Sequence, residues 1–200
     1  MNANLWTRSS LLAIAAAAGL SLCVVSSASA RVPKLKGLSI VTGTSIGGVK
    51  VGMTKAQLIA VWGKPDRCQP PDQYGTTTCE WVAVSTLPGG QKVKQSFTSF
   101  KVRKGKVIVI NLELAENTAI DPKLKRLKTA KNVKLGSKLA DARRKYAIAA
   151  PTGGTDSLSN ALFKQGKRCT RFFAGSAPYN IEAISVGLCS TNNGLDGGLY

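Results

Sequence analysis

The sequence predicts an α+β fold built from two tandem repeats. In each repeat, a short helical segment or helical hairpin packs on a three- to four-stranded antiparallel sheet, with one disulfide per repeat. Three observations favour this fold: a phrase that occurs twice, strand-like segments after each copy, and cysteines that divide evenly between the two halves. Internal repeats of this kind indicate a duplicated packing unit.

Residues 1–30 have the pattern of a secretory signal peptide. Arg8 precedes the apolar run Leu11–Val25, and the small residues Ala28–Ala30 suit cleavage by a signal peptidase. The run is shorter than the roughly 20 residues that span a bilayer, so we expect no transmembrane segment after cleavage. Cys23 follows a leucine rather than a small residue, which argues against lipoprotein anchoring. We therefore expect a secreted or extracytoplasmic protein of the cell envelope.

The repeated phrase reads VKVGMTKAQLIAVW at residues 49–62 and VKLGSKLADARRKY at residues 133–146. Four positions are identical, and Trp62 of the first copy corresponds to Tyr146 of the second. We place both aromatic residues in the core, together with Trp81 of the first predicted strand. The expected units are residues 31–116 for the first repeat and residues 133–191 for the second.

The first copy predicts a well-defined helix. Thr54 and Gln57 have the spacing of a capping box, and Met53 precedes the cap where it can pack on Leu58. Apolar residues then recur at helical spacing up to Gly63, which ends the helix.

The second copy predicts a more polar helix. Ser137 is the expected N-cap, and we expect Arg143, Arg144 and Lys145 to face water. Between the copies, residues 117–132 read as a basic linker, and the glycine-rich residues 192–200 read as a flexible tail.

Each predicted helix is followed by segments with strand character, separated by glycine-containing turns. The predicted strands are Thr77–Ser85, Lys92–Val102, Lys106–Leu114, Asn160–Gln165, Arg168–Ala174 and Ile181–Cys189.

Four cysteines remain after removal of the signal peptide: Cys68, Cys79, Cys169 and Cys189. An even number in an exported chain indicates disulfides, and three pairings are possible. Pairing of the near neighbours, Cys68 with Cys79 and Cys169 with Cys189, suits one bridge in each half. A zinc site is the rival interpretation, but the chain has no histidine and no CxxC spacing. We therefore expect no metal and no other cofactor.

The chain is strongly basic, with a formal net charge of +18. This charge favours anionic partners, which outside the cytoplasm are envelope polymers, lipid headgroups or acidic proteins rather than nucleic acid. The lack of histidine excludes Ser-His-Asp and Cys-His catalytic arrangements. No glycine-rich phosphate loop is present either, so we expect a protein that is not an enzyme.

The segment VKVGMTKAQLIAVWGKPDRC, residues 49–68, resembles the helix entry of the β-lactamase inhibitory protein-like and BamE (SmpA/OmlA)-like superfamily. The tandem arrangement, with one disulfide per repeat, is similar to the inhibitory branch. The resemblance implies helical elements on an antiparallel sheet, twice over, and binding of other proteins without catalysis. It also allows inhibition of a β-lactamase. However, the hairpin at Val84–Lys92 has neither the acidic nor the aromatic residue of the inhibitory members, so those residues are not carried over.

Six residues are candidates for contacting a partner. They are Asp72 and Tyr74 in the cysteine-bounded loop, Lys101 and Arg103 on a strand, and Arg168 and Arg171 near Cys169. The expected function is binding of an unidentified protein. The alternative is a structural protein of the cell envelope that binds an anionic polymer or lipid by charge.

Overall fold

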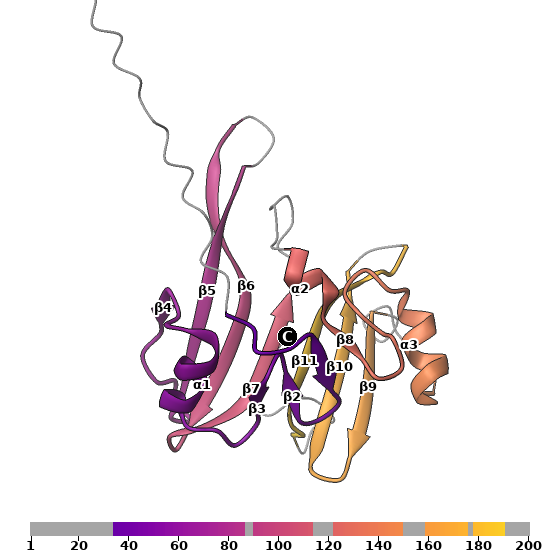
Figure 1. The fold of residues 1–200 in the computed structure, drawn as a ribbon, viewed down its shortest axis with the longest axis horizontal. Helices are drawn as coiled ribbons and strands as arrows, with labels where there is room; N and C mark the ends of the chain where they lie inside the picture. The colour runs from indigo at the N-terminus through magenta and orange to yellow at the C-terminus, as the bar shows by residue number, and fades with distance from the viewer. Residues whose placement is uncertain (1–33, 87–89, 114–121, 150–158, 176–177, 191–200) are drawn as a thin grey trace, which may run out of the picture.

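The computed structural model describes residues 34–86, 90–113, 122–149, 159–175 and 178–190 (Figure 1). The expected signal peptide, Cys23 and the tail at 192–200 lie outside these residues. Within the described ranges, no helix is long and apolar enough to cross a membrane.

Seven strands form one antiparallel sheet in the order β4-β5-β6-β7-β11-β10-β9. They are β4 (Arg67–Cys68), β5 (Thr76–Thr86), β6 (Lys92–Arg103), β7 (Lys106–Glu113), β9 (Asn160–Gln165), β10 (Arg168–Ala174) and β11 (Ile181–Leu188). All but β4 were expected, and each predicted end lies within one residue of the observed end.

The two halves of the chain meet in the middle of this sheet, where β7 pairs with β11 from Val109↔Gly187 to Glu113↔Ala183. The predicted fold of two separate helix-on-sheet repeats is therefore wrong. The physical reason is that β7 and β11 bury nearly all of their residues. A strand that is apolar on both faces is typical of the centre of a sheet, and separate repeats would have left both strands at an edge.

A second sheet has four short strands in the order β3-β2-β1-β8. They are β1 (Ser39–Val41), β2 (Ser45–Ile46), β3 (Val49–Lys50) and β8 (Lys128–Thr129), and β8 runs parallel to β1. The sequence places β8 and α2 (Pro122–Arg126) in a basic linker. In the structure, Leu124 and Leu127 are fully buried, which holds this segment in the core.

The four-stranded sheet, α1 (Lys55–Trp62) and α3 (Leu139–Tyr146) cover one face of the large sheet (Figure 1). The strand register aligns a row of buried side chains on this face. The row is Trp81, Thr98, Leu112, Ile184, Phe172 and Ala161. A single hydrophobic core therefore runs under both helices.

The start of α1 agrees with the sequence prediction. Thr54 Oγ1 accepts a hydrogen bond from the Gln57 amide, and Gln57 Oε1 accepts one from the Thr54 amide, which completes the capping box. At the other end, Trp62 packs edge-on against Trp81 with 5.6 Å between ring centroids. Its indole Nε1 donates to the Gly47 carbonyl at 3.0 Å.

The start of α3 differs from the prediction. Lys138 is the N-cap and makes no side-chain capping bond, whereas Ser137 Oγ accepts from the Lys134 amide. Arg143 is half-buried rather than facing water, because its guanidinium donates to the Asn160 carbonyl of β9 at 2.8 Å. Arg144 is exposed and pairs with Asp141 within the helix.

The opposite face of the large sheet carries a row of mostly polar side chains. The aligned residues are Glu80, Ser99, Asn111, Ser185, Arg171 and Leu162. Ser185 Oγ donates to Asn111 Oδ1 at 2.6 Å, and Glu80 accepts from Arg67 Nε. These bonds satisfy buried polar groups and link neighbouring strands.

Two disulfides form with the pairing favoured from the sequence, Cys68–Cys79 and Cys169–Cys189. The first joins β4 to β5, and the second fixes the chain after β11 to the start of β10. Disulfides of this kind are typical of proteins that function outside the cytoplasm.

Candidate binding groove

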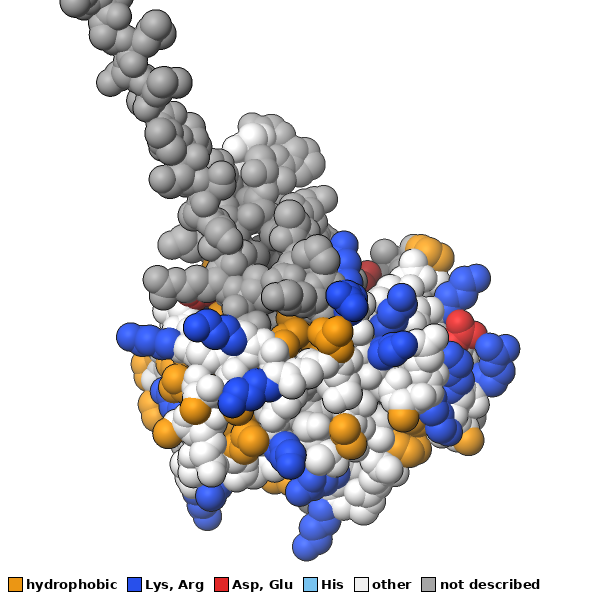
Figure 2. All heavy atoms as spheres, in the orientation of Figure 1, with side chains coloured by type: hydrophobic (Ala, Val, Ile, Leu, Met, Phe, Trp, Pro, Cys, Tyr) orange, Lys and Arg blue, Asp and Glu red, His pale blue; other side chains and the backbone are white. Residues whose placement is uncertain are grey.

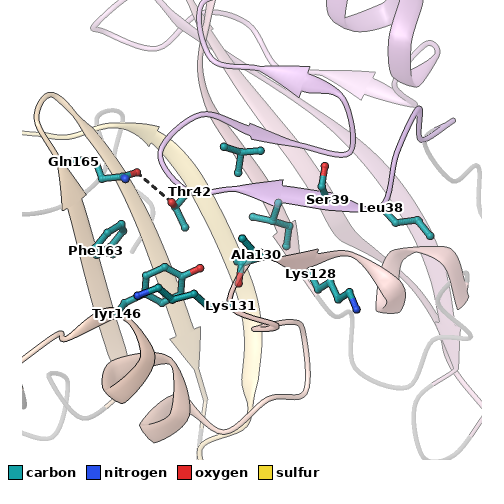
Figure 3. Close-up of a pocket in the computed structure, with 12 residues that line it drawn as sticks. Leu38, Ser39, Thr42, Lys128, Ala130, Lys131, Tyr146, Phe163 and Gln165 are labelled. Atoms are coloured by element: carbon teal, nitrogen blue, oxygen red, sulfur yellow. Dashed lines mark hydrogen bonds between the residues drawn. The ribbon is translucent and has the colours of Figure 1, made fainter.

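A groove lies where the four-stranded sheet meets α3 and β9. Its volume is about 500 Å³, within the range of ligand-binding sites. Residues from β1, from β8 and its following turn, from α3 and from β9 line it (Figure 3). They are Leu38, Ser39, Ile40, Val41, Thr42, Lys128, Thr129, Ala130, Lys131, Tyr146, Phe163 and Gln165. We call this site the Tyr146 groove.

Two aromatic rings form one wall of the Tyr146 groove. Tyr146, at the end of α3, lies with its ring centroid 4.8 Å from that of Phe163 on β9. Its other neighbour is Phe172 of the core, at 5.5 Å. Tyr146 is therefore anchored on the core side while its ring still borders the groove.

Lys131 is held against the same wall. Its ammonium lies 5.0 Å from the centroid of the Tyr146 ring and donates to the Lys145 carbonyl at 2.5 Å. Thr129 fixes the turn that carries Lys131, because its hydroxyl accepts from the Val133 amide and its carbonyl from the Asn132 amide. The lysine thus places a positive charge beside an aromatic surface, an arrangement stabilised by cation–π attraction.

A hydrogen bond closes the opposite end of the groove. Thr42 Oγ1 donates to Gln165 Oε1 at 3.1 Å and joins the end of β1 to β9 (Figure 3). The adjacent Gly43 amide donates to Thr170 Oγ1 at 2.6 Å. Gly43 has a φ of 65°, and a Cβ there would lie 3.0 Å from Arg168 Cβ. Glycine therefore permits this close approach between the two sheets.

The lining of the groove combines exposed apolar side chains with two positive charges. Val41 is 49% exposed and Leu38 is 38% exposed, and both line the groove. Lys128 and Lys131, which also line the groove, are both exposed, and Lys131 lies beside Tyr146 (Figure 3). Among the twelve described lining residues there is no carboxylate. The groove can therefore hold an apolar group and place a negative charge next to it.

Four of the six residues proposed from the sequence lie near one another at the other end of the sheet. Thr76 pairs with Arg103 and Thr78 with Lys101, so the loop that carries Asp72 and Tyr74 lies beside β6. Burial lowers the pKa of Lys101, and the nearby carboxylate of Asp72 partly opposes this effect.

Within that loop, Asp72 has a structural role. Its Oδ1 accepts hydrogen bonds from the Tyr74 amide at 2.8 Å and the Thr76 amide at 2.9 Å, which closes a turn. Tyr74 itself is 71% exposed and remains a candidate contact residue.

The other two candidates, Arg168 and Arg171, do not share a site. They are three positions apart on β10, so their side chains point to opposite faces. Arg168 contacts the Thr44 hydroxyl at 3.5 Å on the helix-covered face. Arg171 donates to Asn160 Oδ1 at 2.7 Å on the other face, and burial lowers its pKa.

The Tyr146 groove was not predicted. The sequence correctly assigns Tyr146, which is 7% exposed, to the core, but it places Lys131 in a linker and gives no strand at β1. A strand of three residues has no periodicity to detect, and the groove forms only where β1 and the segment after β8 meet β9. The one available signal was the aromatic Tyr146 at the end of a polar helix.

No family model matches this chain, and no curated protein matches it. Among solved structures, it is similar to an extracellular SCP-domain protein from Bacillus anthracis str. Ames, with 15% identity and a TM-score of 0.42. It is also similar to a cysteine-rich secretory protein from Staphylococcus aureus subsp. aureus Mu50, with 14% identity and a TM-score of 0.47.

These alignments cover 68% and 78% of this chain but only 43% and 48% of the two structures. The chain therefore spans less than half the length of either one. At this similarity, the two structures assign no activity to the chain.

The expected membership of the β-lactamase inhibitory protein-like and BamE-like superfamily is wrong. The chain forms one seven-stranded sheet instead of the two separate repeats that the resemblance implies, and no family model matches it. Local requirements account for the quoted motif. Gly52 has a φ of 93°, Met53 packs against the core and Thr54 caps α1, so any helix entered by this turn favours these residue types.

Proposed function

We propose that this protein is a non-catalytic, extracytoplasmic binding protein that holds an acidic segment of a partner protein in the Tyr146 groove. The observation that carries the proposal is the combination of exposed apolar residues and two lysines in a lining without carboxylates. An apolar anchor residue would enter between Val41 and Phe163. A neighbouring Asp or Glu would face Lys128 and Lys131.

The shape of the groove supports a protein partner. Protein interfaces derive much of their affinity from a few anchor side chains that fill preformed pockets. A cavity of about 500 Å³ has room for one or two such side chains. Its walls come from two sheets and a helix, joined by the Thr42–Gln165 bond and by Lys131, so little ordering is needed on binding.

The chemistry of the groove supports binding rather than catalysis. The described lining offers hydroxyl groups, an amide and two ammonium groups. A general acid–base reaction needs a side chain that exchanges protons near the working pH, commonly an imidazole or a carboxyl group. The groove lining supplies charge and apolar surface instead.

Selection from a displayed library of linear random peptides tests this proposal. We expect selected peptides to combine a large apolar residue with an adjacent Asp or Glu. Val41→Asp should weaken their binding about tenfold and Lys128→Glu about fivefold, because each change removes one of the two proposed contacts. Lys64→Glu makes the same charge change at an exposed lysine outside the groove and should have less than a twofold effect.

Fluorescence anisotropy measures the affinities, and amide shifts in NMR spectra locate the peptide. Binding that is insensitive to Val41→Asp, or shifts confined to other surfaces, would contradict the proposal. A dodecanoate ion that binds the groove more tightly than every selected peptide would instead assign the groove to a small amphiphile.

A further inference from the structure

A second surface of the molecule is strongly basic and lies at one end of the large sheet. The topology brings the β6–β7 turn and the β9–β10 turn to this same end (Figure 1). The turns carry Lys104 and Lys106 on one side, and Lys167 and Arg168 on the other. Lys50 of β3 lies between them. We call these five residues the basic end.

Direct contacts connect the two turns through the four-stranded sheet. Arg168 contacts the Thr44 hydroxyl, and the Thr44 carbonyl accepts from the Val51 amide at 2.9 Å. The next residue, Gly52, donates its amide to the Val107 carbonyl at 2.8 Å. The cations therefore belong to one continuous surface rather than to two separate hairpin tips.

The segments that build this surface, residues 42–55, 103–107 and 164–168, carry no acidic residue of their own. The loop of Asp72 borders it on the β5 side, where Thr76 pairs with Arg103. Figure 2 shows Lys and Arg side chains projecting from this end, with no acidic side chain among them in that view. Clustered charges of one sign raise the local concentration of oppositely charged partners.

The chemistry of the basic end restricts the class of partner. The exposed large hydrophobic residues among the described part of the chain are Leu38, Val41, Tyr74 and Tyr179, and none is in the three segments. Membrane attachment commonly combines charge with inserted apolar groups, and single-stranded nucleic acid binding uses aromatic stacking. The three segments offer neither, and Tyr74 is in the neighbouring loop beside Arg103. The basic end offers four lysine ammonium groups, which bind phosphates as point charges, and the guanidinium of Arg168, which can bind a phosphate through two N–H groups.

The backbone that presents these charges is held by short turns. Lys104 and Gly105 both have positive φ, as the tight two-residue hairpin turn requires. Gly166 has a φ of 59° in the corresponding turn between β9 and β10. Short turns on a sheet fix the backbone positions from which the lysine side chains project along this end.

We propose that the basic end binds a linear polymer with closely spaced phosphate groups. The polymer would run from the β6–β7 turn across Lys50 to the β9–β10 turn. None of the five basic residues lines the proposed partner groove, although Thr42 and Gln165 border both sites, so either proposal can fail without the other.

Binding of long-chain inorganic polyphosphate tests this inference, with affinity measured by calorimetry over a series of salt concentrations. The triple variant Lys50→Gln, Lys104→Gln, Lys106→Gln should bind about tenfold or more weakly near 0.1 M salt. The slope of log K against log salt should fall by about two to three, because three phosphate contacts are lost.

The matched control is Lys64→Gln, Lys125→Gln, Lys134→Gln, which removes three exposed lysines elsewhere and gives the same net charge. It should change the affinity less than about threefold. Equal losses in both triple variants would overturn the inference, since net charge alone would then explain binding. Tighter binding to vesicles of anionic phospholipid than to polyphosphate would overturn it in favour of a membrane surface. Circular dichroism of both variants verifies that they are folded.

Discussion

The two halves of the large sheet, one covered by α1 and one by α3, differ in how the last aromatic residue of the covering helix is packed. At the α1 end, Trp62 is 1% exposed, and its ring is enclosed by Trp81 and by the turn that carries Gly47. At the α3 end, Tyr146 packs on Phe172, but its other side borders a groove and a lysine. A tryptophan and a tyrosine at corresponding positions of a repeated phrase thus have different roles. The residue itself does not determine the role; the segment that covers it does.

The largest expected effect separates these two aromatic residues. Trp62→Ala should lower the free energy of unfolding by about 3–5 kcal/mol, because it leaves a closed cavity in the core. Tyr146→Ala should cost less, about 2–3 kcal/mol, because water can enter from the groove. Urea denaturation measures both, with the exposed Tyr74→Ala as a control that should change stability by less than about 0.5 kcal/mol. Equal losses at Trp62 and Tyr146 would show that the groove is closed in solution.

A smaller effect concerns the starts of the two helices. Thr54→Ala removes a side-chain cap and should destabilise the protein by about 1 kcal/mol. Lys138→Ala changes an N-cap that makes no side-chain bond and should have an effect within about 0.5 kcal/mol. The same denaturation experiment compares them. A loss at Lys138 as large as that at Thr54 would mean that the α3 cap contributes through another contact.

The smallest effect distinguishes two half-buried cations, Lys101 in β6 and Arg171 in β10. Burial lowers the pKa of Lys101 from its usual 10.5, partly opposed by Asp72, and burial also lowers the pKa of Arg171. As pH rises toward 10.5, the folded protein releases the Lys101 proton before the unfolded chain does. The unfolded state then binds more protons, so stability rises with pH. Arginine stays protonated over this range.

Relative to Lys101→Met, the wild-type protein should therefore gain less than about 1 kcal/mol as pH rises from about 8 to 10.5. Relative to Arg171→Met, it should show no such gain. Denaturation at several pH values measures both differences. Parallel curves for wild type and Lys101→Met would contradict the assigned direction of the Lys101 pKa.

The parts of the fold that sequence reasoning could predict are those with local causes. The ends of six strands, the capping box of α1 and the pairing of four cysteines depend on residues close together in the chain. The failures depend on distant residues. The pairing of β7 with β11 merges what the sequence presents as two units. The parallel pairing of β8 with β1 gives structure to two residues that carry no strand signal.

The candidate sites follow the same division. The cysteine-bounded loop with Tyr74 could be located because its two ends are marked by Cys68 and Cys79. The Tyr146 groove needs β1, β8, α3 and β9 together, and its residues are separated by more than a hundred positions. Net charge predicted an anionic partner, but the position of the basic end depends on which hairpin turns lie at the same end of the sheet.

The β7–β11 pairing has a consequence for any attempt to divide the protein. Cutting the chain between the two halves would turn both strands into open edges with unpaired amide and carbonyl groups. Each strand carries an almost continuous apolar sequence, VIVINL in β7 and AISVGL in β11. Such an edge is a template for pairing with other chains. Separated halves should therefore aggregate when expressed, whereas the intact chain keeps both strands covered and remains one cooperative unit.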